Sequence, residues 1–220
     1  MTLLVVLASA ALLHDWSAIA LRGWTRDGAA VAWEATMQSR EKPDGVVPCS
    51  RVFLVVTDPE GRALGVYRLR SQVPMEEVTW IDEATDSLWK ASGDEGAAQS
   101  WLLSHPLLAV SPPHSLRNGF VLEGGHEKLR VIAKMDSPHS CPTARLRVTL
   151  GSAQADMAAD ACRVDDAAGK GFTSTVQAAW APDGRHAALA WNTTRPARHD
   201  EATRGHIVVV SPAALGHDRH

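Results

Sequence analysis

The same hairpin pattern occurs near both ends of this chain, and it constrains the fold more than any other feature. The first copy, WTRDGAAVAW, runs from Trp24 to Trp33, and the second, WAPDGRHAALAW, runs from Trp180 to Trp191. Each copy has a strand that ends in Trp, then an Asp-Gly pair, then a return strand that ends in Ala-Trp. An Asp-Gly pair between apolar runs is the strongest short-range cue for a β-hairpin. The repeat therefore predicts two similar antiparallel ribbons.

The corners of these ribbons are predicted at Asp27-Gly28 and Asp183-Gly184. Glycine adopts a positive φ without steric cost, and an aspartate side chain can accept hydrogen bonds from backbone N–H groups of its own turn. Their place in the turns explains both aspartates, so we interpret them as structural and not as catalytic acids.

The four tryptophans of the repeat are predicted to lie in the core. In the second copy Val176, Ala178 and Trp180 alternate, and Leu189 and Trp191 continue the pattern on the return strand. A period of two places such residues on one face of a strand. Core packing therefore accounts for these tryptophans better than a ligand-binding platform does.

Two short runs, Val52 to Val56 and Ile207 to Val210, are apolar on both faces and predict strands inside a sheet that is covered above and below. A third hairpin is predicted around Gly61, and another strand pair around Gly124-Gly125. Many short strands with turn residues between them indicate a mainly β fold, an antiparallel meander that forms a propeller-like array or a sandwich.

A small helical insertion is predicted around residues 76–108, where turn residues thin out. Trp80, Ile81, Ala84 and Leu88 recur at helical spacing, and Asp94 is placed to cap a second helix that ends before Pro106. No low-complexity linker divides the chain, so residues 12–220 are interpreted as a single domain.

The N-terminus resembles part of an export signal. Leu3 to Leu13 is apolar, and Ala8-Ser9-Ala10 has the small-x-small form of a cleavage site. We therefore expect residues 1–11 to be a truncated signal segment and the protein to be secreted or periplasmic. A buried first strand or helix is the alternative. The run is too short for a transmembrane span.

The three cysteines also bear on whether the protein is exported. In an exported protein Cys141 and Cys162 are candidates for a disulfide, and Cys49 would then be left over. Reduced cysteines in a cytosolic protein are the alternative.

The segment RHDEATRGH is the main candidate for chemistry. It is predicted to be a polar loop, and it brings together His199, Asp200, Glu201 and His206, four potential ligands for a divalent metal. A solvated charged loop is the alternative.

The sequence lacks common motifs for catalysis, phosphate binding and nucleic-acid binding. It has no Gly-x-Ser-x-Gly elbow and no glycine-rich phosphate loop, and it therefore predicts no catalytic residues and no cofactor. The net charge of −3 comes without a basic stripe in the sequence, which excludes nucleic acid as the expected partner.

The second ribbon closely resembles the hairpin of TolB-type β-propeller repeats, and the first looks like a degenerate copy of it. This resemblance implies a blade in which the Asp-Gly turn joins two inner strands and the following strand continues the meander. More loosely, the whole chain resembles bacterial predicted secreted proteins of unknown function, whose pattern is matched by residues 23–33, 53–58, 76–108 and 141–210. That group has no assigned catalytic residues, so none are transferred.

Two hypotheses follow. The first is an exported, non-catalytic β domain, a binding or structural module for an unknown protein or small ligand. The second is an exported metal-dependent hydrolase that uses the segment from His199 to His206.

Overall fold

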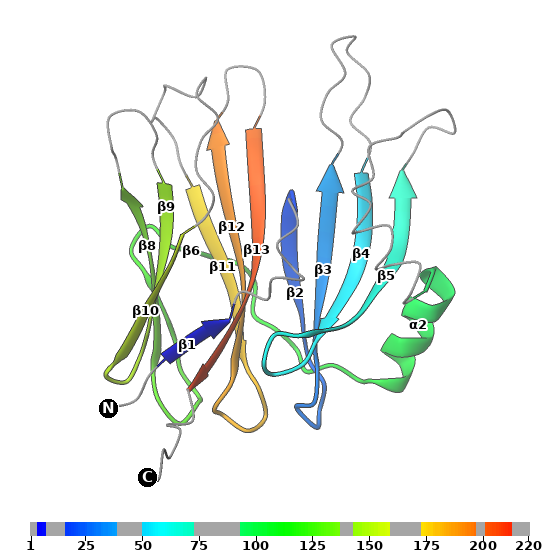
Figure 1. Ribbon diagram of the computed structural model, residues 1–220, viewed down its shortest axis with the longest axis horizontal. Coiled ribbons are helices and arrows are strands. Elements are labelled where there is room, and N and C mark those ends of the chain that lie inside the picture. The colour runs from blue at the N-terminus through cyan, green and yellow to red at the C-terminus, as the bar shows by residue number, and fades with distance from the viewer. Residues whose placement is uncertain are drawn as a thin grey trace, which may run out of the picture.

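The computed structural model describes residues 4–7, 16–38, 50–72, 93–136, 143–158, 173–196 and 201–212. These residues form a mainly β fold in which three antiparallel sheets are stacked, with one helix at one side of the stack (Figure 1). The mainly β prediction is therefore confirmed.

Each sheet is largely a meander of strands that follow one another in the sequence. The N-terminal sheet contains, in spatial order, β2 (Ala18–Trp24), β3 (Val31–Gln38), β4 (Ser50–Thr57) and β5 (Ala63–Gln72). The outer sheet contains β7 (Phe120–Leu122), β8 (Leu129–Asp136), β9 (Thr143–Leu150) and β10 (Ala153–Ala158). The central sheet has the order β1 (Leu4–Leu7), β13 (Glu201–Pro212), β12 (Ala187–Pro196), β11 (Thr173–Trp180) and β6 (His114–Ser115).

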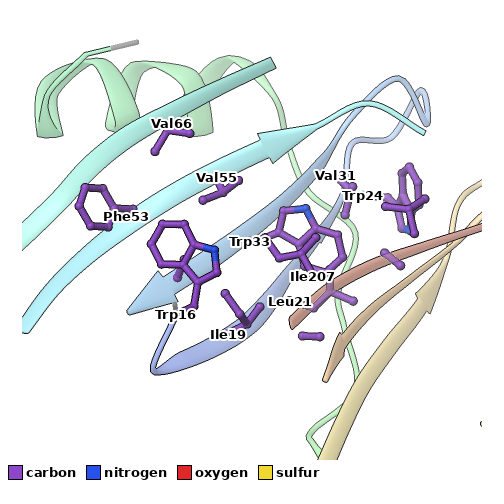
Figure 2. Close-up of a cluster of buried hydrophobic side chains, with 14 of the residues drawn as sticks. Trp16, Ile19, Leu21, Trp24, Val31, Trp33, Phe53, Val55, Val66 and Ile207 are labelled. Carbon is purple, nitrogen blue, oxygen red and sulfur yellow. The ribbon is translucent and has the colours of Figure 1, made fainter. Parts of the chain in front are cut away.

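The central sheet is covered on both faces, as the apolar run of β13 predicted. Val208 and Val210 pack with the outer sheet, whereas Ile207 and Val209 pack with the N-terminal sheet. Figure 2 shows this second core, where Trp33 and Ile207 belong to facing layers. The strand β4 is likewise buried on both faces. The alternation of side chains along a strand produces this division.

The tryptophans of the repeat are core residues. Trp24, Trp33 and Trp191 are fully buried, and Trp180 is half-buried against the core between the central and outer sheets. The indole N–H of Trp33 donates to Thr57 Oγ1 at 3.1 Å, and that of Trp191 donates to Ser174 Oγ at 2.7 Å. A buried indole is satisfied in this way, so the prediction of core packing is confirmed.

The helix α2 (Glu95–Ser104) covers the outer face of the N-terminal sheet. Asp94 caps it, as predicted, and its side chain accepts hydrogen bonds from the N–H groups of Gly96 and Ala97. Ala98 is fully buried against that sheet. The helix predicted around Trp80 lies outside the described residues.

Three segments differ from the prediction or go beyond it. Residues 201–206, expected to be part of a polar loop, form the first half of β13, because they pair with residues 191–196 of β12. Residues 153–158, for which no strand was predicted, form β10 against β9. Residues Leu4–Leu7 form β1, which pairs with β13 at the edge of the central sheet.

Candidate functional site at the hairpin turns

The two Asp-Gly turns have the same backbone geometry. In the first, Thr25 N–H donates to Ala30 O at 2.9 Å, and Gly28 N–H donates to Thr25 O at 2.9 Å. In the second, Ala181 N–H donates to His186 O at 2.8 Å, and Gly184 N–H donates to Ala181 O at 2.9 Å. Both glycines have a positive φ, 73° and 64°. The sequence repeat therefore corresponds to a repeat of one turn conformation.

Each aspartate holds its own turn. Asp27 Oδ1 accepts hydrogen bonds from Thr25 Oγ1 and Ala29 N–H, and these bonds lower the pKa of Asp27 below its usual value. Burial tends to raise the pKa of Asp183, but hydrogen bonds from Arg185 N–H and from the ring and N–H of His186 outweigh it, so this pKa is also lowered. Both carboxylates are therefore ionised at neutral pH.

The turns of three strand pairs lie against one another. A Cβ atom placed on Gly28 would lie 3.3 Å from Pro182 Cδ, so the two Asp-Gly turns are in contact. The turn between β7 and β8 joins them, since His126 N–H donates to Gly184 O at 2.9 Å. In that turn Gly125 lies under Trp180, where a Cβ atom would come within 2.4 Å of the indole. We call these three segments (residues 25–30, 123–128 and 181–186) the turn row.

The turn row is fixed by contacts beneath it. The indole N–H of Trp24 donates to Ala179 O at 3.1 Å, which links the first ribbon to the second. Leu108 N–H donates to Trp24 O at 2.8 Å, which ties the segment after α2 to the same point. Because the turns are held by backbone and indole hydrogen bonds between different sheets, the row is a rigid surface.

A second junction between the ribbons lies where β2 crosses the face of the central sheet. Asn192 makes two hydrogen bonds with one residue of β2: its Oδ1 accepts from Ile19 N–H at 2.8 Å, and its Nδ2 donates to Ile19 O at 2.7 Å. Gln177 Oε1 accepts from Leu21 N–H at 3.1 Å. The outward backbone groups of this edge strand are thus satisfied by side chains of the neighbouring sheet.

Gly205 makes this close approach of β2 feasible. It is the register partner of Asn192, and its N–H donates to Trp16 O at 2.9 Å. A Cβ atom on Gly205 would lie 2.6 Å from the backbone nitrogen of Ile19, which leaves no room for a side chain.

The turn row presents charged side chains to solvent. Arg26, His126 and Arg185 are exposed, and Asp183 is partly exposed beside His186. His186 Nδ1 lies 2.6 Å from Asp183 Oδ2, so the ionised carboxylate orients the ring and makes Nδ1 the donor. The Asp183–His186 contact is local to one turn, whereas the sequence offered no signal for the approach of His126, because that depends on how two turns meet.

The predicted metal ligands are only partly described. His199 and Asp200 lie outside the described residues, and Glu201 is the first residue of β13. His206 is the register partner of Trp191 in β13, and its ring centroid lies 4.8 Å from that of the indole. Within the described ranges no group of three or more His, Cys, Asp or Glu side chains is arranged to hold a metal ion.

The disulfide candidates Cys141 and Cys162 lie outside the described residues, as does Cys49. The one described helix, α2, is too short and too polar to cross a bilayer.

Comparisons with protein-family models, with curated proteins and with solved structures gave no match for this chain. The resemblance to TolB-type repeats therefore stays a prediction.

Proposed function

We propose that this chain is an exported, non-catalytic module that binds a protein or small ligand through the turn row. The observation that carries the proposal is the contact among the turns of three strand pairs, where His126 N–H donates to Gly184 O and Gly28 packs on Pro182. A rigid end that displays charged side chains on short turns is a common form of binding surface on β scaffolds.

The ionisation state of the two turn carboxylates supports a role in binding and not in acid catalysis. Asp27 and Asp183 are engaged by their own turns, and their lowered pKa values keep them ionised, so neither can donate a proton near neutral pH. In the described parts of the chain no group of three or more His, Cys, Asp or Glu side chains is arranged to hold a metal ion, and His206 packs on Trp191.

The sheet order supports the propeller-like interpretation. Each sheet contains a run of antiparallel neighbours in sequence order, and the central sheet is completed by β1 from the other end of the chain. Four-stranded meanders packed face to face are the building plan of propeller blades.

Export is the part of the proposal that rests on the N-terminal segment. The apolar run that resembles a signal also supplies β1, so cleavage after Ala10 would leave the outer edge of β13 uncovered. Intact mass measured on protein from the periplasm or medium tests this directly. A mass that lacks the first residues shows processing, and recovery only from the cytoplasm contradicts export.

The binding surface is tested by site-specific photo-crosslinking in cells. A benzoylphenylalanine side chain replaces Arg185 in the turn row or, as a matched control, Gln99 on α2, and both positions are exposed. We expect a discrete cross-linked product from position 185 and none from position 99. Equal products from both positions, or none from position 185, would contradict the turn row as the binding surface.

A further inference from the structure

The outer sheet has one face that packs on the core and one that faces solvent. Leu129 and Val131 of β8 are fully buried, so Arg130 and Lys134 lie on the opposite face and are exposed. The same alternation applies to β9, where Leu146 and Val148 are buried. Arg145 and Arg147 therefore lie on the solvent face beside the cations of β8.

The strand register gathers these side chains. Lys134 is the partner of Arg145, and Ile132 is the partner of Arg147, which in turn faces Asp156 of β10. We call Arg130, Lys134, Arg145 and Arg147 the basic face. In the sequence they are dispersed over two segments separated by other residues, which is why no basic stripe is visible there.

One carboxylate lies among these cations. Asp156 accepts two hydrogen bonds from Arg147, each 2.7 Å long. These bonds lower the pKa of Asp156, and the charges of Arg147, Lys134 and Arg145 lower it further. Among the side chains of this face that the structure describes, four are cations and one is an anion, although the chain as a whole has a net charge of −3.

Two cations of this face are direct neighbours across the sheet. Like charges directly opposite each other in an antiparallel pair are destabilising, and Lys134 and Arg145 are such a pair.

We propose that the basic face docks the protein on an anionic phospholipid surface. Its cations are spread over a sheet surface instead of converging on a pocket, which suits many phosphates in a plane. Arg130 and Lys134 are four residues apart on one strand, about 13 Å at the usual rise per residue. Half-buried Ile132 lies between Arg130 and Lys134 on β8, exposed Val121 lies beside Arg130 on β7, and both add apolar contact.

The chemistry of the face favours lipid over single-stranded nucleic acid. Sheet surfaces that bind single strands carry exposed aromatic side chains on which the bases stack. The described residues of this face include no aromatic side chain, since Phe120 packs toward the core. The inference does not depend on the turn row, which lies at the ends of the strands and not on this face.

The test is co-sedimentation with vesicles of phosphatidylcholine that contain about one third phosphatidylglycerol, against vesicles of phosphatidylcholine alone. Each basic residue near an anionic surface changes the partition coefficient about fivefold. The full chain should bind the anionic vesicles, and the double variant Arg130→Gln, Lys134→Gln should bind about 25-fold more weakly. Raising the salt to 0.5 M should weaken the binding of the unmodified protein, because the Debye length shortens.

The matched control is Arg26→Gln, Arg185→Gln, which removes the same charge from the turn row. Its vesicle binding should stay within about twofold of the unmodified protein. Equal losses in the two double variants would overturn the proposal, because net charge alone would then govern binding. Equal binding to both kinds of vesicle, or preference for a single-stranded oligonucleotide at the same ionic strength, would overturn it as well.

Discussion

Replacing Asn192 tests how the two ribbons are joined. In the structure the Asn192 side chain forms hydrogen bonds with both the N–H and the C=O of Ile19, and Ile19 is 3% exposed. The substitution Asn192→Ala removes both partners and provides no substitute. A buried backbone group that loses its partner costs about 1–3 kcal/mol, so the two groups together should cost about 2–4 kcal/mol, allowing for some relaxation of β2 toward water.

The expected change is large enough to measure by two methods. For a chain of this size each kcal/mol shifts the melting temperature by about 2–4 °C, so Asn192→Ala should lower it by about 5–15 °C. Urea unfolding can be followed by fluorescence, because the chain has eight tryptophans and several of them are buried in the affected cores. The urea midpoint should fall while the slope stays the same.

Two further variants separate hydrogen bonding from packing. Asn192→Asp keeps the size and can still accept from Ile19 N–H, but it sets a carboxylate oxygen against Ile19 O. It should be destabilised at least as much as the alanine variant. Asn118→Ala, at an exposed turn position, should stay within about 0.5 kcal/mol of the unmodified protein. A loss below about 0.5 kcal/mol for Asn192→Ala, or an aspartate variant as stable as the original, would refute the reasoning.

Three other predictions follow from the same junction and from the turns. Gly205→Ala should destabilise the fold by about 1–3 kcal/mol, because its Cβ would meet the backbone of Ile19; unchanged thermal stability would contradict the close approach. Trp24→Phe should cost about 1–3 kcal/mol in urea unfolding, since it leaves Ala179 O without its indole donor; a neutral result would show that the hydrogen bond does not hold the ribbons together. The lowered pKa values of Asp27, Asp156 and Asp183 contribute stability above the unfolded pKa near 3.8, and this contribution is lost as the pH falls through their folded pKa values. Urea midpoints should therefore change little through these groups between pH 7 and 5 and fall below pH 4, and Asp183→Asn should reduce that fall.

The turns could be predicted from the sequence because the information that determines them is local. An Asp-Gly pair needs only its own few residues to select a positive φ and to accept hydrogen bonds from its own backbone, and Gly28 and Gly184 do so with nearly the same φ. The same holds for the cap of α2 at Asp94 and for the two-sided burial of Ile207 to Val210.

The strand character of residues 201–206 could not be predicted in this way. The segment holds Glu201, Arg204, Gly205 and His206, which is a polar composition typical of loops. It is a strand because β12 offers a continuous ladder of partners from Ala187 to Pro196, so tertiary pairing overrides local propensity. His206 therefore lies against Trp191 in β13 and not in the predicted polar loop.

The role of Gly205 depends both on its local sequence and on packing between distant parts of the chain. As an isolated glycine in a polar segment it favours a loop, yet in the structure it marks the point at which β2 passes directly over the central sheet. Its opposite neighbour Asn192 has the amide geometry that an edge strand needs, a donor and an acceptor side by side. Gly205 and Asn192 together provide the contact site for the backbone of β2, which comes from the other end of the chain. A glycine that pairs with an asparagine across two strands thus predicts the passage of a third strand over the sheet only when the strand register is known. Here the register depends on the whole of β12 and β13.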